Sequence, residues 1–153
     1  MEVTANLLQT VAVNQNVLFT DTVVPGNCSI VHRDGSGLVT MRGITNQCRA
    51  RFRVSFGGNI AIPTSGTIAP ISLAIAINGE PVATTTMTIT PAAGEQFGNV
   101  FSAVFIDVPA GCCSQVSVEN ISTQAIEVKN ANLIVERVAE NGKIKKDKRY
   151  SIV

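Results

Sequence analysis

Short runs of alternating apolar and polar residues, each closed by a turn, recur along most of this chain. Turn sequences rich in Gly, Pro, Asn and Asp separate them. No apolar stripe with helical spacing persists over about 11 residues. The pattern predicts an all-β chain, a sandwich or a barrel. The strand-like runs include NVLFTDTVV, GLVTMRG, CRARFRVSF, ISLAIAI, VATTTMTI, NVFSAVFIDV, QVSVENIS and LIVERVA.

The composition fits one β domain that associates with itself. The chain has 153 residues, of which 45% are hydrophobic and 15% charged, and this length suits a single core. Val, Ile and Ala dominate the apolar residues, as in β proteins rather than disordered chains. No apolar run approaches the ~18 residues of a membrane-spanning helix. The chain has more apolar surface than one small domain easily buries, and this excess favours self-association.

The run CRARFRVSF predicts a strand with a core face and an arginine face, because side chains alternate along a strand. We expect the arginines to form ion pairs on an exposed or intersubunit face with acidic residues such as Glu119, Glu127 or Glu136. The predicted core face is Cys48, Ala50, Phe52, Val54 and Phe56, and the other face is Arg49, Arg51, Arg53 and Ser55.

Two other runs predict an interface between subunits. ISLAIAI has large side chains on one face and small ones on the other, and NVFSAVFIDV is apolar on both faces. A strand that is apolar on both faces needs cover on both, and in a sandwich of this size a second subunit supplies it. The candidate interface residues are Ile71, Leu73, Ile75, Phe101, Ala103 and Phe105.

Between these runs, Asn78-Gly79 is the sharpest hairpin signal, because Asn-Gly readily adopts the positive φ angles of a tight primed turn. The order of the stretches LVTMRGITNQCRARFRVSFGGNI, ISLAIAINGEPV and FIDVPAGCCSQVSVENIS resembles the bacterial and phage branch of the tumour necrosis factor and complement globular-head superfamily. The resemblance implies a ten-strand antiparallel jelly-roll sandwich that assembles as a homotrimer. The chain departs from the family pattern at Cys112-Cys113, where an acidic or polar residue is usual.

No motif in the chain predicts catalysis or a cofactor. The single histidine, His32, stands in SIVHRDGSG without a nucleophile-elbow sequence, so we interpret it as a polar residue beside a turn. Phosphate-binding loops and a calcium loop are absent from the sequence. We therefore predict a protein that is not an enzyme and has no catalytic, metal or cofactor site.

The four cysteines leave several states open. Reduced thiols are the default without a secretory signal, since position 2 is acidic and no basic segment precedes an apolar one. A disulfide from Cys28 to Cys48, or from Cys112 or Cys113 to either, is an alternative. Zinc is disfavoured because adjacent cysteines point to opposite sides of a strand. We expect Cys112 and Cys113 to enter a strand, one facing the core and one facing outward.

The last thirteen residues carry a net charge of +4, while residues 1 to 140 carry about −3. This segment is either a solvated extension or a contact for an anionic partner through Lys143, Lys145, Lys146, Lys148 and Arg149. The acidic body and the lack of aromatic residues among the arginines argue against nucleic acid. The predicted organisation is an arm or first strand over 1–16, a jelly roll over 17–138 and a basic tail over 139–153.

The resemblance implies a structural protein of a bacteriophage or prophage, a trimeric capsid decoration or fibre head whose partner is the major capsid protein or another virion component. Its expected place is the virion surface, after assembly in the bacterial cytoplasm, without nucleic acid or membrane partners. The alternative is a carbohydrate- or receptor-binding module on a fibre tip or on a bacterial or spore surface. The chain has no Trp, and its only Tyr is Tyr150, which counts against stacking on sugars.

Overall fold

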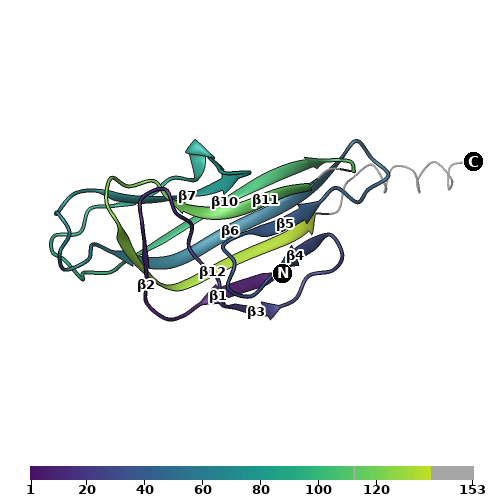
Figure 1. Cartoon of the computed structure of the whole chain (residues 1–153). Coiled ribbons are helices and arrows are strands. Elements are labelled where there is room, and N and C mark those ends of the chain that lie inside the picture. The colour runs from purple at the N-terminus through teal and green to yellow at the C-terminus, as the bar shows by residue number, and fades with distance from the viewer. Residues whose placement is uncertain (112, 139–153) are drawn as a thin grey trace, which may run out of the picture.

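The computed structural model describes residues 1–111 and 113–138, which form two antiparallel β-sheets packed face to face (Figure 1). In sheet A the strand order is β10-β6-β12-β1-β3, with β2 also paired to β12. In sheet B the order is β4-β5-β11-β7-β8, with β9 also paired to β7. The strands are β1 Glu2–Ala5, β2 Gln9–Val11, β3 Asp21–Val24, β4 Ile30–His32, β5 Val39–Arg42, β6 Arg49–Ala61, β7 Ile71–Ile77, β8 Glu80–Pro81, β9 Met87–Ile89, β10 Gly98–Pro109, β11 Cys113–Asn120 and β12 Ile126–Val138.

The twelve strands of the described residues occupy ten positions, five in each sheet. β1 and β2 both pair with β12, so they are two parts of one interrupted strand. In the same way, β8 and β9 both pair with β7. The all-β, ten-strand antiparallel sandwich predicted from the sequence is therefore confirmed. No helix among the described residues is long and apolar enough to cross a membrane.

The alternation within β6 predicts its faces correctly. Ala50, Phe52, Val54 and Phe56 are fully buried between the sheets, while Arg53 on the other face is exposed. Cys48 is the exception, because β6 begins at Arg49 and Cys48 is exposed just before it. Phe56 also packs edge to face against Phe19, with ring centroids 6.4 Å apart.

The predicted turn at Asn78-Gly79 is confirmed. Asn78 has a φ of 52° and Gly79 a φ of 86°, and the turn joins β7 to β8. Positive φ at both positions is what a tight primed hairpin turn requires. The Asn78 side chain also accepts a hydrogen bond from the backbone N–H of Gln115 at 2.9 Å, which ties the turn to β11.

A threonine fills the gap between β8 and β9. The short 3₁₀ turn Ala83–Thr85 separates these two strands, so part of β7 lacks a strand partner on that side. Thr85 is fully buried there. Its Oγ1 accepts the backbone N–H of Ile75 at 2.9 Å and lies 2.7 Å from the carbonyl oxygen of Val82. The hydroxyl thus takes the place of the missing strand partner.

Asn120 holds the start of the chain against the end of β11. It is fully buried, and its Nδ2 donates to the carbonyl oxygens of Val11 and Gln124, each at 3.0 Å. Residues 1–16, which the sequence leaves open as an arm or a first strand, contain β1 and β2 within sheet A. They are part of the sandwich and not a free arm.

Candidate interaction surface

Among the described residues, the most exposed large aromatic side chains lie on β10, an edge strand of sheet A. Phe101 is 66% exposed and Phe105 is 62% exposed, and Ala103 between them is exposed too. The alternate residues, such as Ile106 and Val108, face the core and are buried. We call Phe101, Ala103 and Phe105 the phenylalanine row. Two phenyl rings exposed on one strand make this face the candidate interaction surface of the described residues.

The row continues as an apolar strip across sheet A. Opposite Phe101 on β6 is Gly57, and opposite Ala103 is Ser55. A methyl group added at Gly57 would stand 3.8 Å from Cδ2 of Phe101, so the ring lies close to the glycine. Beyond Ser55, on β12, comes Ile134, which is 37% exposed. Small residues between larger apolar ones leave a shallow surface on which another protein can pack.

The strip ends at a set of ion pairs that the arginines of β6 make. Asp107 Oδ1 accepts from Arg51 Nε at 2.8 Å, and Asp107 Oδ2 lies 3.0 Å from Arg49 Nε. Arg53 Nη2 lies 2.5 Å from Glu136 Oε1. The hydrogen bond from Arg51 is the main cause that lowers the pKa of Asp107. Pairs this exposed contribute little stability, about 0.2–1 kcal/mol each, but they neutralise the rim of the apolar strip.

Of the three acidic partners suggested by the sequence, only Glu136 pairs with an arginine in the described residues. Asp107 was missed because its position opposite Arg51 depends on the pairing of β10 with β6, and three strands separate these two along the chain. Burial and then the nearby Glu80 raise the pKa of Glu119.

Glu127 pairs with another acid. Burial, and next a hydrogen bond with Glu95, raise the pKa of Glu127, while the same hydrogen bond and Thr64 lower the pKa of Glu95. Nearby, Lys129 Nζ lies 4.1 Å from the centre of the Phe97 ring. These contacts fasten the loop before β10 to the outer face of sheet A.

The other three candidate interface residues lie elsewhere. Ile71, Leu73 and Ile75 on β7 are all fully buried in the core of their own subunit. A side chain without exposed surface has none to bury against a partner, so the prediction that these three line an interface is wrong. Ala74 and Ala76 on the opposite face of β7 are also fully buried. The structure therefore separates the two strands that the sequence groups together.

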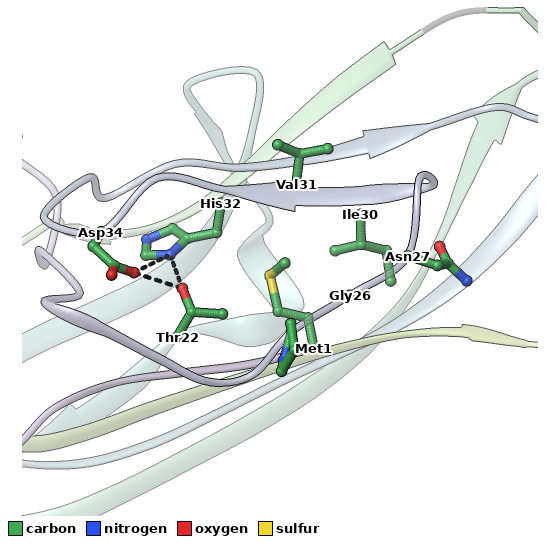
Figure 2. A pocket seen from close by; sticks show the side chains of 9 residues that line it. Met1, Thr22, Gly26, Asn27, Ile30, Val31, His32 and Asp34 are labelled. Atoms are coloured by element: carbon green, nitrogen blue, oxygen red, sulfur yellow. Dashed lines mark hydrogen bonds and ion pairs between the residues drawn. The ribbon is translucent and has the colours of Figure 1, made fainter.

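His32 does not form a catalytic triad. Figure 2 shows its ring beside Thr22 and Asp34, at one end of an open pocket of about 440 Å³ that Met1 also lines. Nδ1 lies 2.8 Å from Thr22 Oγ1 and 3.8 Å from Asp34 Oδ1, while Nε2 lies 3.0 Å from the carbonyl oxygen of Ser36. In a triad, one ring nitrogen faces the hydroxyl and the other faces the carboxylate. Here the Thr22 hydroxyl and the Asp34 carboxylate both lie near Nδ1, and the backbone carbonyl oxygen of Ser36 lies near Nε2.

Cys28, Cys48 and Cys113 are exposed free thiols. Cys113 therefore faces outward at the start of β11, whereas Cys112 lies outside the described residues. Within residues 1–111 and 113–138, no group of three or more His, Cys, Asp or Glu side chains is arranged to hold a metal ion. The five basic residues from Lys143 to Arg149 lie outside the described residues too.

No protein-family model matches the sequence, and the search of curated proteins found no match. Among solved structures, the globular domain of zebrafish complement 1qA protein aligns with a TM-score of 0.57 at 13% identity, over 87% of this chain and 93% of that one. Murine APRIL aligns with a TM-score of 0.55 at 7% identity, over 86% and 95%. The CBM35 from Cellvibrio japonicus Abf62 aligns at only 0.40, with 10% identity over 91% and 98%.

These likenesses show the fold. The chain is an all-β sandwich with the jelly-roll fold of the tumour necrosis factor and complement globular-head type. A TM-score of 0.40 carries no argument for a carbohydrate-binding module. The function rests on the surface of this chain, because a fold of this kind hosts many unrelated roles.

Proposed function

We propose that the chain is a non-enzymatic structural module that assembles as a homotrimer through the phenylalanine row. It serves on the surface of a bacteriophage or prophage particle, as a capsid decoration or fibre head. The exposure of Phe101 and Phe105 carries the proposal. The fold supports it, since the sequence resemblance implies a trimer for this type of jelly roll.

The proposed trimer is a closed ring of subunits. In such a ring, the phenylalanine row of one copy, on an edge strand of sheet A, contacts a different surface of the next copy. Contacts between unlike surfaces close into a ring when the rotation between copies allows it. Three copies then present three identical attachment points to a larger particle, and the avidity of three weak contacts exceeds that of one.

Light scattering at micromolar concentration tests the assembly. The mass of one chain is 16.1 kDa, and we expect the wild-type protein to elute at about three times this mass. The double variant Phe101→Ser/Phe105→Ser should elute at the mass of one chain. Val31→Ser is the matched control, because Val31 is a 43% exposed aliphatic residue on β4 of the other sheet. A monomeric wild-type protein would refute the trimer.

A carbohydrate- or receptor-binding module is the competing function, because exposed phenyl rings also stack on sugar faces. A glycan array separates the two. Saturable binding of a glycan that the double variant loses would favour the binding module. The structural role is tested with purified particles that lack the protein. A decoration protein should bind to these particles in a fixed ratio to the major capsid protein.

A further inference from the structure

Three leucines are exposed on the side of sheet A away from the phenylalanine row. Leu7 is 83% exposed, the highest value among the large apolar side chains of the described residues, and Leu8 and Leu18 are about half exposed. Leu7 and Leu8 join β1 to β2, and β6 and β12 separate this position from β10. We call Leu7, Leu8 and Leu18 the leucine patch.

The side chain of Gln9 holds the patch together. Gln9 Nε2 donates to the carbonyl oxygen of Leu18 at 2.9 Å, and the backbone N–H of Leu18 donates to Gln9 Oε1 at 2.9 Å. The amide thus pairs with the backbone of Leu18 as a neighbouring strand would. The backbone N–H of Asn130 donates to the carbonyl oxygen of Asn6, which ties the Leu7–Leu8 turn to β12. A surface fixed in this way loses less conformational freedom when it binds a partner.

The patch borders the same outer face of sheet A as the phenylalanine row. Thr10 on β2 is opposite Glu127, and Gln9 is opposite Val128, which is fully buried. Side chains alternate along a strand, so Thr10 points outward, and so does Leu8, which directly precedes β2. The outer face of sheet A therefore has phenyl rings along its β10 edge and leucines beyond β12.

Both surfaces come from segments without charge. Residues 3–20 and residues 96–106 contain no Asp, Glu, Lys, Arg or His. A partner with a charged face would lose the hydration of its charges against either surface, without gaining ion pairs. A second copy of this chain brings an uncharged apolar surface instead. Each copy has one row and one patch, so a closed ring of copies covers all of them.

We propose that the phenylalanine row of one copy packs against the leucine patch of the next copy. The inference rests on the proposed homotrimer and names the second surface that a closed ring requires. The contact joins unlike surfaces, so it repeats around the ring in one direction. A row that packed against the row of another copy would instead give a two-fold pair and would leave Leu7 and Leu8 exposed.

Light scattering on two complementary variants tests the contact. Leu7→Ser/Leu8→Ser removes the patch and keeps the row, and Phe101→Ser/Phe105→Ser removes the row and keeps the patch. Each variant alone should elute at the mass of one chain. An equal mixture should form pairs of about twice that mass, because one row and one patch still meet and neither free end can continue the ring. Val31→Ser on sheet B should keep the mass of the wild type.

The outcomes separate this inference from the proposed assembly. A monomeric wild-type protein would refute the homotrimer itself. A wild-type trimer that Leu7→Ser/Leu8→Ser leaves unchanged would refute only the role of the leucine patch. Circular dichroism of each variant checks that the chain still folds, and Leu18→Ser provides a second, milder variant that should weaken the trimer without abolishing it.

Photo-crosslinking tests the contact without weakening it. A photoreactive phenylalanine analogue at position 105 of the otherwise wild-type chain should crosslink to residues 7–18 of another copy. Mixing isotopically light and heavy chains before irradiation identifies the links between copies by mass spectrometry. Links from position 105 to β10 of another copy, or to any segment other than residues 7–18, would overturn the inference.

Discussion

β7 and β10 look alike in the sequence, yet they have opposite surroundings in the structure. Both alternate apolar residues with small or apolar ones. On β7 both faces are covered within one subunit, since Ile75 and Ala76 are each fully buried. On β10 one face is buried and the other exposes Phe101 and Phe105. Cover within the subunit explains the first strand, and the exposed face of the second is the surface that we propose for assembly.

The difference teaches that position in the sheet decides what an apolar face means. β7 lies between β11 and the β8–β9 side of sheet B, while β10 is an outermost strand of sheet A. The apolar side chains of β7, an interior strand, are buried by other parts of the same subunit. An edge strand with exposed aromatic residues has paired backbone on one side only, which makes it a ready site for association.

The largest expected effect separates stability from assembly. Leu73→Ala on β7 removes a fully buried side chain and should lower the free energy of unfolding by about 2–5 kcal/mol. Phe105→Ala on β10 removes an exposed ring, so it should leave the stability of a single subunit nearly unchanged and weaken assembly. Chemical denaturation and light scattering on both variants measure the two effects. A Phe105→Ala subunit as unstable as Leu73→Ala would mean that the ring is part of the core.

The alternation in the sequence predicts which side chains share a face, and this part of the prediction holds for β6 and β10. It does not predict which face a second layer covers. Ile71 and Phe101 are both apolar residues in alternating runs. The order of the strands in the folded sheets determines that Ile71 is buried and Phe101 is exposed. That order comes from pairings between distant segments, such as β6 with β10 and β1 with β12. No spacing within one run carries this information.

The alternation also does not predict where a strand begins or how a loop folds over a sheet. The alternation extends through Cys48, but the strand begins one residue later and leaves the thiol exposed. Glu127 is paired with Glu95 instead of an arginine, because the loop before β10 folds back over sheet A. By contrast, the Asn78-Gly79 turn is predictable, since its conformation depends on two adjacent residues alone.

A second prediction concerns how β7 is closed on its outer side. Thr85→Val keeps the shape of the side chain but leaves the buried N–H of Ile75 without the hydroxyl acceptor found at 2.9 Å. We expect a loss of about 1–3 kcal/mol in the free energy of unfolding. Thr86→Val on the neighbouring, exposed position is the control. Faster hydrogen exchange at the Ile75 amide would place the damage at this gap, and equal stability of the two variants would contradict the closure.

A third prediction concerns the charged end of β10. The hydrogen bond from Arg51 lowers the pKa of Asp107 below its ordinary value of 3.8. The carboxylate therefore adds stability above that value and loses it as the pH falls through the lowered pKa. Because the Asp107 side chain is 40% exposed, solvent screens the pair, and Asp107→Asn should cost only about 0.5–1 kcal/mol at pH 7. The difference from the wild type should shrink below pH 3 and in high salt, and a difference independent of both would rule out an ionic origin.

The smallest effect on the sandwich should come from the basic segment. Deletion of residues 141–153 leaves β12, which ends at Val138, and the phenylalanine row untouched. The oligomeric mass and Tm should therefore stay as in the wild type. Addition of the truncated protein to particles measures the anionic-partner role of Lys143, Lys145, Lys146, Lys148 and Arg149, and binding should weaken and lose its salt dependence. Unchanged particle binding would leave attachment to the sandwich itself, and a change in oligomeric mass would show that β10 is not sufficient for assembly.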